Sequence, residues 1–250
     1  MADAPPTARS DTTGASRPEP LANPGRAGSP PPGLRALLIV LTGATGLIDA
    51  ASYLGVGHVF VANMTGNVVL LGFALSGAAG LSIAASVAAM AGFFVGAAAG
   101  GRWAVASSRR AKRWLSSASA AQTVLVGAAA ATTATGLLRA DGWSRLVLLA
   151  LLGVAMGLQN ATARRLAIPD LTTTVLTQTL TGLAADSSIA GGSSPRRVRR
   201  MSAALAMLVG ALIGGWLTLH AGLPTALTAS AGAFALIAVG LAVVVPDSDL

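Results

Sequence analysis

Long apolar runs, separated by short polar or basic stretches, follow one another from residue 34 to residue 245. A helix needs about 20 residues to cross about 30 Å of hydrocarbon. Backbone groups in lipid must pair within their own segment, so such runs have to be helical. The pattern predicts an all-α integral membrane protein with six to eight apolar segments, drawn from 34–54, 58–77, 80–103, 117–138, 144–163, 171–190, 201–219 and 222–245.

Polar side chains interrupt two of these segments. In VFVANMTGNVVLLG, residues 59–72, two amides and a hydroxyl stand among aliphatic residues: Asn63, Thr65 and Asn67. The sixth segment, LTTTVLTQTLTGLAADSS, is rich in threonine. Polar groups inside the bilayer are costly and usually face protein or water. The sixth segment is therefore not expected to face lipid along its whole length.

An internal duplication is indicated by three stretches that recur in the same order at offsets of 111, 112 and 114 residues. The pairs are GLIDAASYL with GLQNATARRL, VANMTGNVVLLG with TTVLTQTLTGLA, and GAAAGGRW with GALIGGW. The first pair sets Asp49 opposite Asn160, and the second sets Thr65 opposite Thr177. The sequence thus predicts two membrane repeats, 34–138 and 139–250, the second with a short C-terminal tail.

The chain begins with a proline-rich stretch, residues 1–33, which holds eight of the twelve prolines and no apolar run. Such a composition cannot bury enough apolar surface to fold. We expect a disordered tail on the cytoplasmic side of the membrane.

Positive charge is concentrated between the apolar runs. The chain carries 17 Lys and Arg against 9 Asp and Glu, a net charge of +8, and the main basic clusters lie at 102–113 and 196–200. Nucleic-acid binding would need these side chains on one face, so no nucleic-acid partner is predicted. Basic clusters between membrane segments are typical of cytoplasmic loops.

The charge pattern also bears on topology. If all eight segments cross, the two basic clusters fall on opposite sides of the membrane, against the positive-inside rule. If segments 58–77 and 171–190 only dip in and return, both clusters lie in the cytoplasm and each repeat keeps three crossings. The halves are then inverted, a recurrent plan of transporters. Eight full crossings stays open as the alternative.

The candidate chemistry centres on Asp49, the one acidic residue of the first apolar segment. Counted from Arg35 it lies roughly 21 Å into a core of about 30 Å, where a carboxylate costs about 2.5–3.5 kcal/mol and is functional by default. Asn63 and Asn67 are four residues apart and would share one helix face. The predicted substrate or ion-binding residues are Asp49, Asn63, Thr65, Asn67, Gln159, Asn160, Thr177 and Gln178.

Two functions fit these residues. The first is a small-molecule or ion transporter in which Asp49 binds substrate or a coupling ion at a polar midplane site. The second is a non-transport membrane protein, a structural partner or sensor, whose polar residues only pack helices. We expect no enzymatic activity, cofactor or metal, because the chain has no cysteine and no catalytic motif. The expected partners are the lipid bilayer, an unidentified small molecule or ion, and a possible second copy of the chain.

Small residues recur at helical spacing in two segments. Gly92, Gly96 and Gly100 follow one another at every fourth position, as do Gly210 and Gly214. This spacing lets two helices approach closely. Packing within the subunit is favoured over a dimer interface.

The stretches GLIDAASYLGVGHVFVANMTGNVVLLG and AMGLQNATARRLAIPDLTTTVLTQTLTGLA resemble the YoaK-type family of bacterial multi-pass membrane proteins, a domain-of-unknown-function family. The resemblance spans roughly residues 34–245 and excludes the tail. It implies an integral protein of the bacterial cytoplasmic membrane, and it implies no activity or substrate. The residues that match are Asp49, Asn63, Thr65, Gly66, Asn67, Gln159, Asn160 and Thr177.

Overall fold

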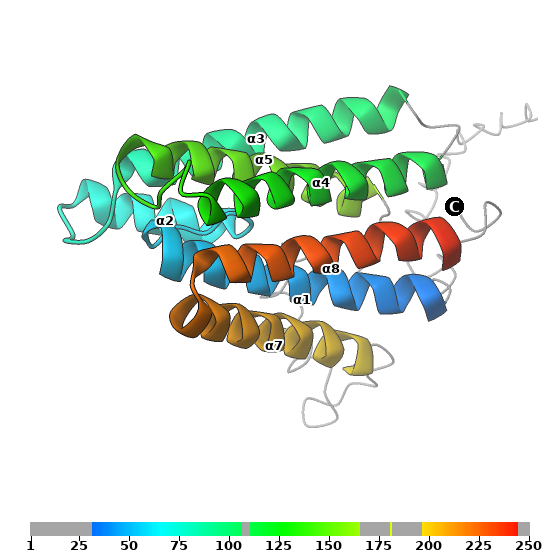
Figure 1. Ribbon diagram of the computed structural model, residues 1–250. Coiled ribbons are helices and arrows are strands. Elements are labelled where there is room, and N and C mark those ends of the chain that lie inside the picture. Colours follow the sequence, from blue (N-terminus) through cyan, green and yellow to red (C-terminus); the bar gives the residue numbers. More distant parts are fainter. Residues whose placement is uncertain (1–31, 107–110, 166–180, 182–196, 245–250) are drawn as a thin grey trace, which may run out of the picture.

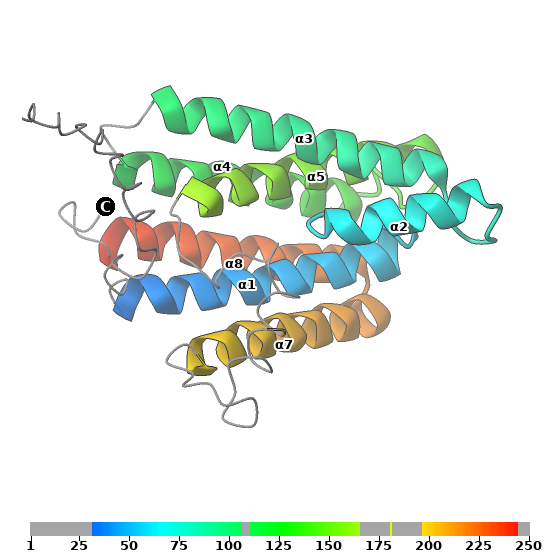
Figure 2. The same ribbon diagram turned by 180° about the vertical axis from the view of Figure 1, so that it is seen from behind.

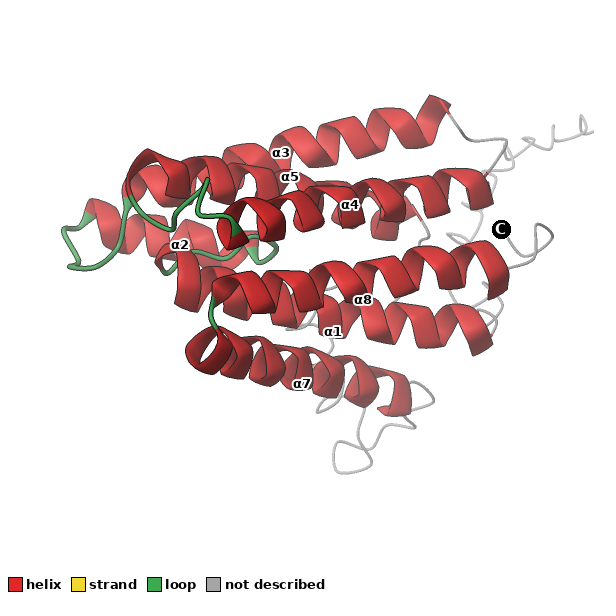
Figure 3. Cartoon of the chain, in the orientation of Figure 1, coloured by secondary structure: helices red, strands yellow, loops and turns green. Residues whose placement is uncertain are grey.

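The computed structural model describes residues 32–106, 111–165, 181 and 197–244, and within them the regular structure is entirely helical (Figure 3). The predicted all-α class is confirmed. The sixth predicted segment, 171–190, lies outside the described residues apart from position 181. The elements are α1 (Pro32–Ser52), a π-helical turn η2 (Tyr53–Gly57), α2 (Met64–Leu75), α3 (Ile83–Ala106), α4 (Ala111–Ala134), α5 (Gly142–Arg165), α7 (Arg197–Ala221) and α8 (Leu223–Val244).

The lengths of the helices show which of them can cross a membrane, and α2 is too short to do so. Among the residues that the structure describes, five helices are long and apolar enough to cross a membrane, namely α1 with η2, α3, α5, α7 and α8. Helix α4 is also 24 residues long, and it begins six residues before the predicted start at 117. Its first turn contains Lys112 and Arg113. With 12 residues, α2 reaches only about 18 Å and cannot cross.

Close approaches between helices fix their directions (Figure 1). Gly46 lies against the carbonyl of Met207 and Gly55 against Thr218, so α1 and α7 run parallel. The same reasoning applies to α3 and α5, in which Gly92 lies against Ala150 and Gly96 against Val154. Gly240 of α8 meets Leu37 near the start of α1, which makes these two helices antiparallel.

The six long helices of the described residues therefore alternate in direction along the chain. Residues 32, 106, 111, 165, 197 and 244 lie at one end of the bundle, which we call the basic end because Arg35, Arg102, Arg164 and Arg200 lie near it. Turn η2, the end of α2 and the connections 135–141 and 222 lie at the other, the opposite end (Figure 2). Segment 53–82 enters and leaves at the opposite end, as the six-crossing topology requires.

The contacts of the α1–α7 pair and the α5–α3 pair correspond to each other, as an inverted duplication predicts. Gly46 lies against the carbonyl of Met207, and 111 residues later Gly157 lies against the carbonyl of Phe93. A Cβ on either glycine would overlap that carbonyl. The first long helix of each half thus packs on the second long helix of the other, α1 on α7 and α5 on α3. The glycines pack within the subunit, as expected. The domain boundaries stay a prediction.

Four helices form the centre of the bundle. Helix α4 packs against α8 and α5, and α8 also packs against α1. Helices α3 and α7 lie outside this group, one beside α5 and the other beside α1 (Figure 1). The interior of the group is apolar, with fully buried Leu148, Leu152, Leu227 and Phe234. The few polar side chains within it therefore stand out as candidate functional groups.

Candidate functional site

The chain re-enters the bundle after α1. Turn η2 ends at Gly57, and His58 adopts a left-handed backbone conformation with φ of 58° that reverses the chain. The following residues return to the level of Asp49, since Val61 and Ala62 hydrogen-bond to its side chain. Asp49 precedes Gly57 by eight residues, so the loop 58–63 reaches roughly 10 Å into the bundle. We call residues 58–63 the re-entrant loop.

Asp49 holds this loop through the backbone. Its Oδ1 accepts the N–H groups of Val61 at 2.9 Å and Ala62 at 2.8 Å. The side chain is 4% exposed. A buried carboxylate is stabilised by hydrogen bonds from backbone N–H groups, so the two bonds account for its tolerance at this depth. Asp49 faces protein, as the sequence predicts.

The two asparagines of the polar stretch, Asn63 and Asn67, make different contacts. Asn63 caps α2, its Oδ1 accepting the N–H of Gly66 at 3.1 Å, and its side chain is exposed. Asn67 is fully buried and clasps Phe60 through both its amide atoms, at 2.9 and 2.6 Å. The prediction that the two share a helix face was wrong, because α2 begins only at Met64.

Aromatic contacts also hold the re-entrant loop in place. The ring of Phe60 stacks on that of Tyr53 with centroids 4.9 Å apart, and His58 meets Tyr53 edge to face. Thr65 is exposed at the start of α2. The loop is therefore held from α1 by Asp49, from η2 by Tyr53 and from α2 by Asn67.

A second polar group joins three central helices. Gln159 of α5 donates from Nε2 to Oγ1 of Thr45 on α1 at 2.8 Å, and its Oε1 accepts from Nε2 of Gln122 on α4. Gln122 and Gln159 are 2% and 5% exposed. Thr45 precedes Asp49 by four residues and so lies on the same face of α1. The two polar groups therefore occupy successive levels of the bundle.

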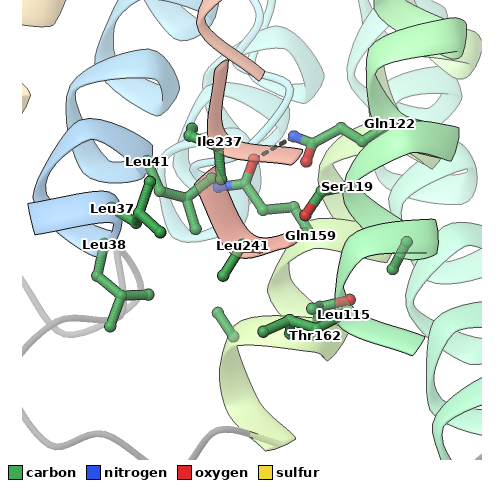
Figure 4. Close-up of a pocket in the computed structure, with 12 residues that line it drawn as sticks. Leu37, Leu38, Leu41, Leu115, Ser119, Gln122, Gln159, Thr162, Ile237 and Leu241 are labelled. Carbon is green, nitrogen blue, oxygen red and sulfur yellow. Dashed lines mark hydrogen bonds between the residues drawn. The ribbon is translucent and has the colours of Figure 1, made fainter. Parts of the chain in front are cut away.

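A small pocket with a free volume of about 20 Å³, room for little more than a water-sized group, extends from this glutamine pair toward the basic end (Figure 4). Its polar lining consists of the two glutamines with Ser119 and Thr162, and its other walls are apolar. The lining residues are Leu37, Leu38, Leu41, Leu115, Ala118, Ser119, Gln122, Gln159, Thr162, Ala163, Ile237 and Leu241. An apolar concavity with a few convergent polar groups is the usual form of a small-molecule site.

The structure thus divides the predicted site residues between two places. Asp49, Asn63, Thr65 and Asn67 belong to the re-entrant loop and its supports, whereas Gln159 lines the pocket. Asn160 is half-buried and its Nδ2 donates to the carbonyl of Met156 in its own helix at 3.0 Å. Thr177 and Gln178 lie outside the described residues. Their assignment as binding residues stays a prediction.

Sequence reasoning missed Gln122 and Ser119. Both stand in the alanine-rich segment SSASAAQTVLVGAAA, in which small and weakly polar residues conceal a glutamine. The available signal was that Gln122 is an uncharged amide well inside a predicted crossing. Such a group needs a protein partner in lipid.

In the described part of the chain, long helices of alternating direction, five of them long and apolar enough to cross a membrane, combine with buried polar side chains and a basic end. These features define a multi-pass helical membrane protein. The chain belongs to the family described as "Protein of unknown function (DUF1275)", whose model matches residues 37–240. This confirms the resemblance to a YoaK-type family.

One curated relative is the UPF0700 transmembrane protein YoaK of Bacillus subtilis (strain 168). It is 33% identical over 156 residues, which cover 61% of this chain and 66% of the relative. The chain thus spans slightly less than two thirds of that protein's length. No solved structure matches the chain significantly.

Proposed function

We propose that this protein transports a small molecule across the membrane and binds it in the pocket beside Gln122 and Gln159. One observation carries the proposal: a hydrogen-bonded amide pair lies at the inner end of a pocket between four central helices. Burying polar groups in a membrane helix is costly and usually serves function.

The position of the pocket supports this function. Its walls come from α1 and α4 of the first predicted repeat and from α5 and α8 of the second. Transporters with inverted repeats bind substrate where the repeats meet, and they open the site by moving one part against another. Toward the opposite end, buried Val56, Val59 and Val61 belong to the apolar core. In the proposal they form the barrier that has to open, and the re-entrant loop carries two of them.

We place the protein in the cytoplasmic membrane of a bacterium, with the basic end in the cytoplasm. The location follows the resemblance to a bacterial transmembrane protein. The orientation follows the positive-inside rule, because Arg35, Arg102, Arg164 and Arg200 lie near one end and Arg139 and Arg145 near the other.

A specific observation also favours the non-transport alternative. The side chains of Asp49, Asn63 and Asn67 all hydrogen-bond to backbone groups of the chain itself. They can therefore act purely as supports of the re-entrant loop. A role of Asp49 in coupling stays a prediction.

Ligand screening followed by uptake tests the transport proposal. Compounds and ions are screened for those that raise the unfolding temperature of the purified protein, because a ligand at 100 times its Kd stabilises the folded state by about 2.7 kcal/mol. We expect a stabilising compound that also enters proteoliposomes, and Gln159→Leu should lose both effects.

The matched control is Thr42→Val. Thr42 is buried in α1 like the pocket residues, yet it bonds only to the carbonyl of Leu38 in its own helix at 2.9 Å and lies outside the pocket. It should retain ligand stabilisation and uptake. If Gln159→Leu only lowers stability, while every ligand response and uptake rate stays as in the wild type, the polar pair serves packing and the alternative holds.

A further inference from the structure

The single hydroxyl proton of Thr45 determines which groups donate and which accept in the hydrogen bonds between Thr45, Gln159 and Gln122. The hydroxyl of Thr45 donates to the carbonyl of Leu41 at 2.9 Å. A hydroxyl has a single proton, so toward Gln159 it can only accept. Gln159 must then turn its NH2 group to Thr45 and its carbonyl to Gln122. Gln122 offers its own NH2 group, which leaves the carbonyl oxygen of Gln122 outside this chain of bonds.

In Figure 4 the amide nitrogen of Gln122 faces Gln159, and its carbonyl oxygen lies on the side of Ser119, which also lines the pocket. The hydroxyl of Thr162 donates to the carbonyl of Leu158 at 2.8 Å, so only its lone pairs are left for the pocket. Ser119 adds a hydroxyl that can donate or accept. The polar wall of the pocket therefore offers acceptors at Gln122, Ser119 and Thr162. The second N–H of Gln122 lies against the sulfur of Met156 at 3.7 Å, and the second N–H of Gln159 is left as an amide donor.

Within the described ranges, the lining of the pocket also carries no charge. None of its twelve lining residues is ionisable. A cation in it would be buried without a carboxylate partner, and an anion would face carbonyl and hydroxyl oxygens, which is unfavourable in an apolar site. Arg35 and Arg164 near the basic end repel cations further. An uncharged molecule that carries hydrogen-bond donors meets neither objection.

We propose that the pocket binds small uncharged solutes bearing N–H or O–H groups, and that the carbonyl oxygen of Gln122 accepts a hydrogen bond from them. This inference rests on the proposed function and names its substrate class. Gln122 is then a binding residue, and Gln159 and Thr45 position it by fixing which way its amide faces.

Uptake of four labelled probes into proteoliposomes tests the class. Urea is small, uncharged and rich in donors, guanidinium has the same shape with a positive charge, acetate is a small anion, and trimethylamine N-oxide has an acceptor and no donor. We expect urea to enter at least tenfold faster than into protein-free vesicles, and the other three to enter at the protein-free rate.

Two variants link uptake to the pocket. Gln122→Leu removes the carbonyl and should abolish the added urea uptake. Ser119→Ala changes little volume and should lower it several-fold while the protein stays folded. Thr123→Val is the control, because Thr123 lies outside the pocket and bonds only to the carbonyl of Ser119 in its own helix. Urea uptake unchanged by both Gln122→Leu and Ser119→Ala overturns the assignment of the site.

A binding measurement separates this inference from the proposed function. Ala118→Cys places a lone thiol on the pocket wall of a chain without cysteine, and its rate of modification by a small methanethiosulfonate reports occupancy. One outcome is that urea protects the thiol, trimethylamine N-oxide does not, and no probe is taken up. This result supports the proposed solute class and contradicts the proposed transport function. If guanidinium, acetate or trimethylamine N-oxide enters and urea does not, transport stands and the solute class is wrong.

Discussion

At the scale of single residues, one buried carboxylate accepts hydrogen bonds from backbone N–H groups that belong to no helix. Asp49 lies inside a crossing helix, yet its oxygen accepts two N–H groups of a loop that comes twelve residues later. Those N–H groups belong to non-helical residues before α2, and a buried backbone N–H needs an acceptor. The acid is thus needed where the backbone leaves regular structure inside the bundle.

Substitution of Asp49 should separate hydrogen bonding from charge. Asp49→Ala leaves the N–H groups of Val61 and Ala62 without an acceptor, at about 1–3 kcal/mol for each buried group. Asp49→Asn keeps a carbonyl oxygen in place and should cost about 1 kcal/mol. Thermal unfolding in detergent measures both, with Thr42→Ala as a control for loss of a polar side chain from the same helix. Equal destabilisation by Asn and Ala would mean that the charge itself is required.

The sequence predicted these residues better than their partners. The depth of Asp49 and its need for a partner could be predicted from a count of residues, because helix rise and bilayer thickness are fixed. Its partners turned out to be backbone groups, which no residue type signals. The pairing of Gln122 with Gln159 across 37 positions depends on how α4 and α5 pack. It could not be predicted from either segment alone.

At the scale of elements, glycine positions set which helices pair. Gly96 and Gly157 bring α3 and α5 into backbone contact, and Gly46 and Gly210 do the same for α1 and α7. The spacing of four was visible in the sequence and predicted close packing within the subunit. The partner of each helix was not visible, because small residues fit any neighbour. Only the folded bundle shows that the first long helix of each half packs on the second long helix of the other half.

A matched pair of substitutions in α3 tests this packing. A Cβ at Gly96 would overlap the carbonyl of Val154, whereas Gly101 has no atom of another element within 4 Å of that position. We expect Gly96→Ala to destabilise the protein by about 1–3 kcal/mol through forced separation of α3 and α5. Gly101→Ala should be neutral or slightly stabilising, since alanine favours helix. Unfolding temperatures in detergent compare the two, and equal values would refute close contact at Gly96.

At the scale of the whole molecule, helix direction and charge agree. The bundle brings the start of α1, α4 and α7 together with the end of α3, α5 and α8. Arginines that are far apart in the sequence thereby gather near one end. The charge pattern predicted this re-entrant arrangement as one of two alternatives, and the short α2 with its loop shows that segment 58–77 enters and leaves the bundle at the opposite end. The corresponding segment 171–190 stays a prediction.

Single cysteines test the orientation of the bundle, and the chain contains no cysteine of its own. Ala78 is exposed in the turn between α2 and α3 at the opposite end, and Ala106 is exposed at the end of α3, at the basic end. If the basic end is cytoplasmic, a membrane-impermeant maleimide added to intact cells should label Ala78→Cys fully and Ala106→Cys only after permeabilisation. Each variant is its own control, because permeabilised cells give the complete labelling of that site. The reverse pattern would place the basic end outside, and partial labelling of both sites in intact cells would show that the protein inserts in two orientations.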